Sequence, residues 1–260
     1  MISAVRAAQF AESLEDAQVR AEPIAQFSAT APLEVDAAYQ VQHALIARRV
    51  EGGDRVVGLK LGFTSRAKAR QMGVEDVILG TLTAGMQIPD GGAFEFGSCI
   101  HPRVEPEVAY LLGSDVDAHD GNAIAAVAPA IEIIDSRYRN FQFDLGDVVA
   151  DNTSAAGFAI GPWMTPAEAG RIDNRAVLLE VDDRLVQTGS TSAILGHPAR
   201  ALAVARRLAA THGFALRSGM ILLAGAATVA IPLPQRGIVE TSIAGLGRVR
   251  IRIEQNGASK

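Results

Sequence analysis

Apolar residues recur every three or four positions in the first fifty residues, which is the period of a helix with one buried face. Two segments carry this pattern, VRAAQFAESLEDAQ at 5–18 and LEVDAAYQVQHALIARRV at 33–50. Gly52 and Gly53 follow the second segment, and glycine commonly ends a helix. The pattern therefore predicts an N-terminal helical region over residues 1–54.

After residue 54 the apolar runs shorten and are separated by Gly, Pro and Asp, which is typical of strands joined by turns. The segment 176–189 predicts a hairpin that turns at Asp182 and Asp183. We expect helices at 64–73, 121–129 and 198–213, and further strands at 55–63, 77–82, 85–96, 100–112, 130–135, 219–233, 237–247 and 248–255. The sequence thus predicts an α+β fold in which residues 55–260 form one β-rich structural unit.

Composition excludes several classes of protein. The chain is 48% hydrophobic and 20% charged with a formal charge of −5, whereas nucleic-acid surfaces normally carry clustered basic residues, so no nucleic-acid partner is expected. No apolar run approaches the roughly 20 residues that span a bilayer. The single cysteine, Cys99, excludes an intrachain disulfide and a multi-cysteine metal site. We therefore expect a packed cytoplasmic protein with no membrane partner.

Two acids stand close together in HPRVEPEVAY at 101–110. Side chains alternate along a strand, so Glu105 and Glu107 share one face, with their backbones about 6.6 to 6.8 Å apart. Two carboxylates this close raise each other's pKa unless a cation lies between them. The cation can be an arginine such as Arg103 on a solvated face, or a divalent metal ion bound by both acids.

Glu132 strengthens the second alternative. It lies among isoleucines in PAIEII at 129–134, where a buried carboxylate without a partner would be costly. Three carboxylates with no histidine or cysteine pattern nearby favour a hard ion, Mg²⁺ or Mn²⁺. The loop residues that follow either line a pocket or simply solvate a loop; they are Arg137, Tyr138, Arg139, Asp151 and Asn152.

Lys60 is unusual because only three of the 24 basic residues are lysines, and this one lies in the apolar run VVGLKLGF. Its ammonium group can extend from the strand into water, as most lysines in apolar segments do. Alternatively, it lies near a metal-bound oxyanion, where it would stabilise developing negative charge or donate a proton.

Four segments together resemble the 4-oxalocrotonate decarboxylase and 2-keto-4-pentenoate hydratase group of the fumarylacetoacetate hydrolase superfamily. They are GLKLGFTSRAKARQMGV, HPRVEPEVAYLL, PAIEIIDSRYRNFQFDLGDVVADNTS and LGHPARALAVARRLA. The resemblance implies a mixed β-roll preceded by helices, with residues 55–260 as the catalytic domain. It also implies that Glu105, Glu107 and Glu132 bind Mg²⁺ or Mn²⁺ and that Lys60 is the active-site lysine.

The same resemblance bears on the reaction. Hydratases of this group look like P-D-[FY]-G, whereas this chain has VEDVILG, which places Ile78 at the position of the acid and in the substrate site. An aliphatic side chain cannot activate water. The resemblance therefore implies decarboxylation of 2-oxo-3-hexenedioate, a small dicarboxylic 2-oxo acid, to 2-hydroxypenta-2,4-dienoate in meta-cleavage degradation of aromatic compounds.

Other activities remain open at this point. Asp76, two residues before Ile78, offers a substitute acid for a hydratase that would form 4-hydroxy-2-oxopentanoate. A small-acid binding protein or a structural subunit of a decarboxylase and hydratase assembly is a further alternative. The resemblance implies a homo-oligomer and a complex with a hydratase of the same family.

Overall fold

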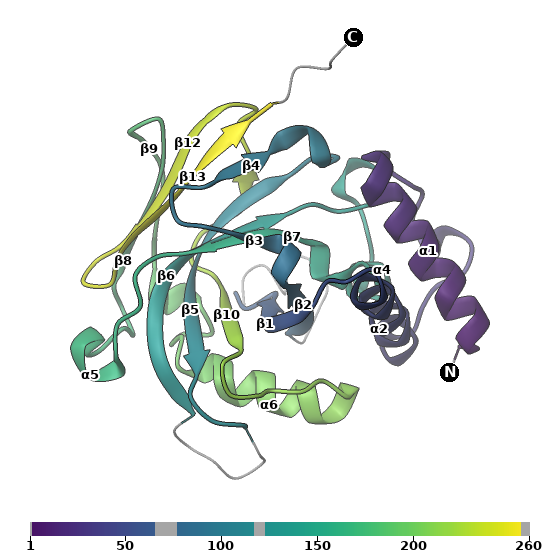
Figure 1. The fold of residues 1–260 in the computed structure, drawn as a ribbon, viewed down its shortest axis with the longest axis horizontal. Coiled ribbons are helices and arrows are strands. Elements are labelled where there is room, and N and C mark those ends of the chain that lie inside the picture. Colours follow the sequence, from purple (N-terminus) through teal and green to yellow (C-terminus); the bar gives the residue numbers. More distant parts are fainter. Residues whose placement is uncertain (1, 66–76, 117–122, 256–260) are drawn as a thin grey trace.

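The structure of the protein is a computed structural model that describes residues 2–65, 77–116 and 123–255. Figure 1 shows two β-sheets with helices packed around the larger one. The helices are α1 (Ala4–Arg20), α2 (Val35–Glu51), α4 (Leu145–Ala150), α5 (Pro166–Ala169) and α6 (Arg200–His212). The strands are β1 (Val56–Gly62), β2 (Ile78–Thr83), β3 (Gln87–Ile88), β4 (Ala93–Glu95), β5 (Arg103–Leu112), β6 (Ile124–Ile134), β7 (Ala155–Ile160), β8 (Ala176–Val181), β9 (Arg184–Ser190), β10 (Ile221–Ala226), β11 (Ile231–Pro232), β12 (Gly237–Ile243) and β13 (Gly247–Glu254).

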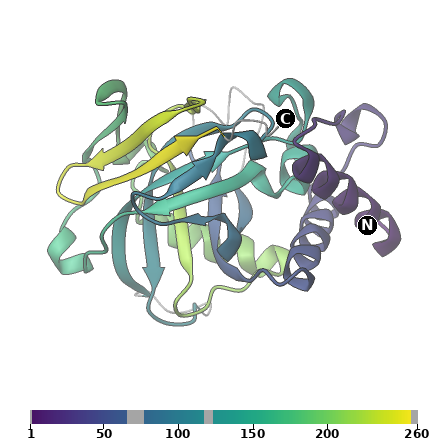
Figure 2. The same cartoon turned by 45° about the horizontal axis from the view of Figure 1, so that its top comes forward.

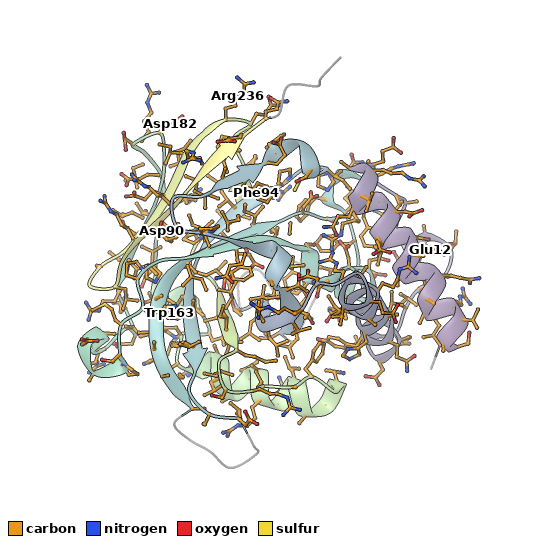
Figure 3. The ribbon with its side chains drawn as sticks, viewed as in Figure 1. Glu12, Asp90, Phe94, Trp163, Asp182 and Arg236 are labelled. Carbon is orange, nitrogen blue, oxygen red and sulfur yellow. The ribbon has the colours of Figure 1, made fainter. Side chains whose placement is uncertain are left out.

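The larger sheet has the order β2-β1-β10-β5-β6-β7-β3, with β11 paired to β5. The smaller sheet has the order β4-β13-β12-β8-β9 and packs across it, as Figure 2 shows. Apolar residues from both sheets fill the space between them, among them Ile131, Ile133, Val239 and Ile251. Phe94 of β4, labelled in Figure 3, joins this layer. Its ring lies near Gly157 of β7. The larger sheet is thus covered on one face by the smaller one.

The two N-terminal helices form as their apolar periodicity predicts. Helix α1 buries Ala7, Ala11 and Leu14, and helix α2 packs between α1 and the larger sheet. The Tyr39 hydroxyl accepts the Leu79 amide hydrogen, and the Gln42 side chain donates to the Leu79 carbonyl. Both contacts are buried and join α2 to β2. The helical region therefore shares its core with the larger sheet.

The hairpin prediction is confirmed, because β8 and β9 turn through Asp182 and Asp183, whose φ angles are 48° and 58°. Asp182 lies at the outer end of this hairpin (Figure 3). Helix α6 ends at His212 with Gly213 in the left-handed region, also as predicted. The helix predicted at 64–73 lies largely outside the described residues.

The helix predicted at 121–129 is wrong from residue 124 onward. Residues 124–134 form the single strand β6, which pairs with β5 on one side and with β7 on the other. Alanine-rich segments favour helices when isolated, but a strand in the centre of a sheet gains buried contacts on both faces, which overrides that preference. Among the described residues, no helix combines the length and apolarity needed to span a bilayer.

Candidate metal centre and active site

The three candidate acids come from two central neighbouring strands. Glu105 and Glu107 lie on β5, and Glu132 lies on β6 directly opposite Glu105 in the antiparallel register. The alternation of side chains puts all three on one face of the sheet. Oxygen atoms of the three carboxylates lie within 4.8 Å of one another. The structure therefore brings together the acids that the sequence singled out.

These carboxylates are almost completely removed from water, with exposed fractions of 8% for Glu105, 0% for Glu107 and 1% for Glu132. One oxygen of Glu107 accepts the Gly225 amide hydrogen at 2.8 Å. Within the described residues, Glu107 Oε1 and Glu132 Oε2 receive no hydrogen bond from an N–H or hydroxyl group. Buried polar atoms are normally bonded, so these two oxygens point to a missing partner.

The electrostatics indicate a cation. Burial and the neighbouring Glu132 hold the pKa of Glu107 well above its ordinary range. Burial also raises the pKa of Glu132, although the nearby Lys60 ammonium opposes this rise. A divalent ion would replace the lost hydration of these groups and allow them to ionise. Because the cluster consists of carboxylate oxygens, it fits a hard ion such as Mg²⁺ or Mn²⁺.

Lys60 lies on β1 and is 3% exposed, so its ammonium group does not reach water. Its Nζ lies 2.7 Å from Glu132 Oε1 and donates to the Thr153 carbonyl at 3.0 Å. Strands β10 and β5 separate β1 from β6, which corresponds to about 14 Å in a flat sheet. The sheet is therefore rolled, and this curvature closes the site around Glu132.

Two glycines make room for this arrangement. Gly80 of β2 pairs with Lys60 of β1, and a Cβ at Gly80 would lie 2.9 Å from Lys60 Cγ. Gly225 has a φ of 109° at an irregularity of β10, and a Cβ there would lie 2.1 Å from Thr64 Oγ1. The positive φ turns the Gly225 amide toward Glu107. Sequence reasoning did not find these two residues, although glycine inside a strand is a signal of a bulge or a close approach.

The segment that holds the Thr153 carbonyl has an unusual backbone. Asn152, Thr153 and Ser154 all have φ angles near 50°, a left-handed region that non-glycine residues rarely adopt. The Asn152 side chain accepts from the Thr81 amide and donates to the Thr81 carbonyl. Next to it, Asp151 forms a buried ion pair with Arg137. Arg137, Asp151 and Asn152 thus fix the loop rather than solvate it.

A cavity of about 310 Å³ opens onto this site. Lys60, Glu105, Thr153 and Arg103 line it, and Arg103 lies on the same face of β5 as Glu105. The remaining wall is mainly apolar and includes Ile134, Phe141, Phe143, Val148, Ala226 and Val229. The arrangement can bind a small anionic molecule with an unsaturated or aliphatic body and stabilise negative charge beside Lys60.

Known proteins share this architecture. The C-terminal family of fumarylacetoacetate hydrolase matches residues 70–254. The chain belongs to the fumarylacetoacetate hydrolase family. A 4-oxalocrotonate decarboxylase of a Pseudomonas species is 45% identical to it over 251 residues, covering 94% of this chain and 96% of the relative. A 2-keto-4-pentenoate hydratase of Paraburkholderia xenovorans is 33% identical, covering 95% of this chain and 94% of the relative.

The solved structure of 4-oxalocrotonate decarboxylase from Pseudomonas putida G7, complexed with magnesium and adipate, matches this member of the fumarylacetoacetate hydrolase family with a TM-score of 0.92. It is 33% identical, and the match covers 97% of this chain and 99% of that one. These findings confirm the expected resemblance and the mixed β-roll with N-terminal helices.

Ile78 occupies a different place from the other candidates in this fumarylacetoacetate hydrolase family member. It begins β2, is 3% exposed, and is not among the described residues that line the cavity. Its side chain abuts Gly62, because a Cβ at Gly62 would lie 2.9 Å from Ile78 Cγ1. Gly62 does line the cavity. Ile78 thus supports the wall from behind, and its contact with substrate stays a prediction; Asp76 lies outside the described residues.

Proposed function

We propose that this protein is a divalent-metal-dependent carboxy-lyase that converts 2-oxo-3-hexenedioate (4-oxalocrotonate) to 2-hydroxypenta-2,4-dienoate and carbon dioxide. The observation that carries the proposal is the buried cluster of three carboxylates beside Lys60, in which no N–H or hydroxyl group of the described residues donates to Glu107 Oε1 or Glu132 Oε2. The higher identity to a 4-oxalocrotonate decarboxylase, 45% against 33% for a hydratase, favours decarboxylation over hydration.

In this proposal Glu105, Glu107 and Glu132 hold Mg²⁺ or Mn²⁺. The bound ion would act as a Lewis acid toward the 2-oxo group of the substrate. The magnesium and adipate bound in the Pseudomonas putida G7 structure support this assignment, since adipate is also a six-carbon dicarboxylic acid. The fit of the cluster to a hard cation supports it independently.

The chain's own residues supply the remaining functions. Cleavage of the bond to the distal carboxylate releases carbon dioxide, and its electron pair moves through the conjugated double bond to the 2-oxygen. Lys60, held by Glu132 and the Thr153 carbonyl, places a positive charge where this negative charge develops. One proton taken up by the 2-oxygen completes the dienol product. Among the described residues, the apolar part of the cavity wall, which Ile78 supports, carries no acid that would activate water for hydration.

The test is to supply purified, magnesium-loaded protein with 2-oxo-3-hexenedioate and to measure carbon dioxide release. In parallel, 2-hydroxypenta-2,4-dienoate is supplied and the reaction is analysed for 4-hydroxy-2-oxopentanoate. We expect carbon dioxide release and no hydration. Hydration without carbon dioxide release would establish the hydratase alternative, and the absence of both reactions would support a binding protein or a structural subunit.

We also propose that residues 1–54 and 55–260 fold as one unit, supported by the buried hydrogen bonds from Tyr39 and Gln42 to β2. A homo-oligomer is supported by the edge strand β9, which exposes Leu185 (54%) and Val186 (41%).

The proposed product is the enol form of 2-keto-4-pentenoate, so a hydratase of this family would consume it. We therefore propose that this protein forms a complex with such a hydratase. The lone Cys99 supports a location in the reducing cytoplasm.

A further inference from the structure

A dianionic substrate needs a second positive partner in the cavity. The proposed metal centre and Lys60 account for the end of the molecule that carries the 2-oxo group. The described residues that line the cavity include two cations, Lys60 and Arg103. Lys60 is already engaged by Glu132 and the Thr153 carbonyl. Within the described part of the chain, Arg103 has no ion pair.

The position of Arg103 matches the length of the substrate. It is the first residue of β5 and lies on the same face as Glu105, so the two backbones are about 6.6 to 6.8 Å apart. The carboxyl carbons of an extended six-carbon diacid are separated by roughly 6 Å on standard bond lengths. One end of such a molecule beside Glu105 therefore leaves the other end within reach of the Arg103 side chain.

The surroundings of Arg103 orient its guanidinium group. Its Cζ lies 4.3 Å from the centroid of the Phe141 ring, a cation–π contact that keeps the planar group against one wall. Ile134, the strand partner of Arg103 on β6, also lines the cavity. A guanidinium group held in this way offers two parallel N–H donors, which match the two oxygens of a carboxylate.

We propose that Arg103 binds the distal carboxylate of the substrate, the one that leaves as carbon dioxide, and so makes the site selective for dicarboxylic over monocarboxylic 2-oxo acids. This inference rests on the proposed function and adds a specificity-determining residue to it. The lining cation, the spacing along β5 and the ring that orients the guanidinium group carry it together.

The chemistry predicts how Arg103 acts in turnover. As the bond to the distal carboxylate breaks, negative charge leaves that group and moves to the 2-oxygen. The ion pair with Arg103 is therefore stronger in the bound substrate than in the transition state, and it contributes to affinity rather than to rate. Loss of Arg103 should therefore raise KM and leave kcat level or higher.

The test compares two acids that differ only at the distal end, 2-oxoadipate and 2-oxohexanoate, in which a methyl group replaces the distal carboxylate. Their binding to magnesium-loaded protein is measured by calorimetry for wild type, Arg103→Gln and Arg103→Lys. The control is Arg250→Gln, because Arg250 is an exposed arginine of β13. We expect Arg103→Gln to weaken the binding of 2-oxoadipate at least tenfold and that of 2-oxohexanoate less than twofold. Arg103→Lys should have an intermediate effect on 2-oxoadipate binding, and Arg250→Gln should bind both acids as wild type does.

Equal weakening of both acids, or no change in either, would overturn the role of Arg103. A second variant, Phe141→Leu, removes the ring that orients Arg103 but keeps the Arg103 charge. It should weaken the binding of 2-oxoadipate severalfold and leave the binding of 2-oxohexanoate unchanged. Calorimetry does not depend on turnover. If wild type fails to release carbon dioxide but Arg103→Gln selectively weakens the binding of 2-oxoadipate, the decarboxylase function is refuted and the Arg103 assignment stands.

Discussion

The protein buries two groups of charged side chains, and they differ in how completely they are bonded. Arg137 pairs with Asp151, donates to the carbonyls of Asp135, Asp151 and Ala155, and is itself fully buried. The cluster of Glu105, Glu107 and Glu132 is also buried, but no N–H or hydroxyl group in the described part of the chain donates to two of its oxygens. The first group is therefore fully bonded by the described residues, whereas the second fits the metal ion that we propose for it.

This difference distinguishes buried charges that stabilise the fold from buried charges that bind a ligand. A buried ion pair offsets its loss of hydration only when its hydrogen bonds are satisfied, as those of Arg137 are. That pair fixes the left-handed loop that carries Thr153 to Lys60. An unsatisfied carboxylate cluster lowers stability unless a cation binds to it. Without a metal ion, the carboxylate cluster is therefore expected to lower the stability of the fold and to bind a divalent cation tightly.

The largest effect is expected for Glu107→Gln, which removes one charge from the carboxylate cluster. Magnesium binding and decarboxylation should fall together, by more than the roughly 10- to 100-fold typical of groups that only orient a ligand. The stability of the metal-free protein should stay level or rise, because a neutral amide replaces a buried carboxylate. Calorimetric magnesium titration, activity and urea unfolding measure the three quantities. Glu254→Gln, at an exposed position of β13, is the control; unchanged activity in Glu107→Gln would refute its role as a ligand.

The reverse pattern is expected for Asp151→Asn, which breaks the complete ion pair. It leaves Arg137 buried without its counter-charge, so the free energy of unfolding should fall by about 3–5 kcal/mol. Urea denaturation measures this change. Asp173→Asn is the matched control, because Asp173 pairs with an arginine, Arg171, that is 89% exposed, and little change is expected. If Asp151→Asn is as stable as wild type, the Arg137–Asp151 ion pair does not stabilise the fold.

Lys60→Met tests the residue that connects the carboxylate cluster to the loop fixed by Arg137 and Asp151, since Lys60 contacts both Glu132 and the Thr153 carbonyl. The variant keeps an unbranched side chain of similar length but removes the charge beside Glu132. We expect kcat to fall by about 10²–10³, the usual cost of losing a group that stabilises an oxyanion. Magnesium affinity should be kept or improved, since Lys60 competes with the ion for Glu132. A variant that binds less metal but turns over normally per bound ion would contradict this role.

A smaller effect concerns pH. Burial raises the pKa of Glu107 and Glu132 in the folded, metal-free protein, so it retains protons that the unfolded chain has released above about pH 4.5. Its stability should therefore fall as the pH rises above about 5, through the raised pKa values of the folded protein. Magnesium binds the ionised carboxylates, so the rise in Tm that it produces should grow over the same range.

Thermal unfolding with EDTA or magnesium at several pH values measures both trends. Asp151, whose pKa burial raises to about 6, contributes a change of the same sign, so Glu107→Gln serves as the control and should keep part of the slope. A Tm increase with magnesium that is the same at every pH would contradict the prediction.

The sequence predicted those parts of the site that depend on local pattern. Strand alternation placed Glu105 and Glu107 on one face, the apolar context marked Glu132, and the scarcity of lysine marked Lys60. It missed Gly225 and the Thr153 carbonyl because these reach Glu107 and Lys60 from 118 and 93 residues away in the chain. Long-range contacts of this kind leave no periodic signal.

The fold shows the same division. The N-terminal helices, α6 and the β8–β9 hairpin follow from period and turn residues. Strand β6 does not, since its alanine-rich start reads as a helix until β5 and β7 are placed on either side of it. The expected role of Ile78 likewise depends on which residues stand between it and the cavity, and only the packing against Gly62 reveals that.

The pairing of Glu105 with Glu132 also bears on how the protein folds. These acids lie on strands joined by one connection, β5 and β6, whereas Lys60 reaches Glu132 only after β1 has docked beside β10 and the Thr153 loop has formed. Contacts between residues close in sequence form earlier than distant ones because less loop entropy is lost. Refolding should therefore assemble the three acids before their ammonium partner arrives, so the repulsion among them should slow the pairing of β5 with β6, and millimolar magnesium should accelerate it.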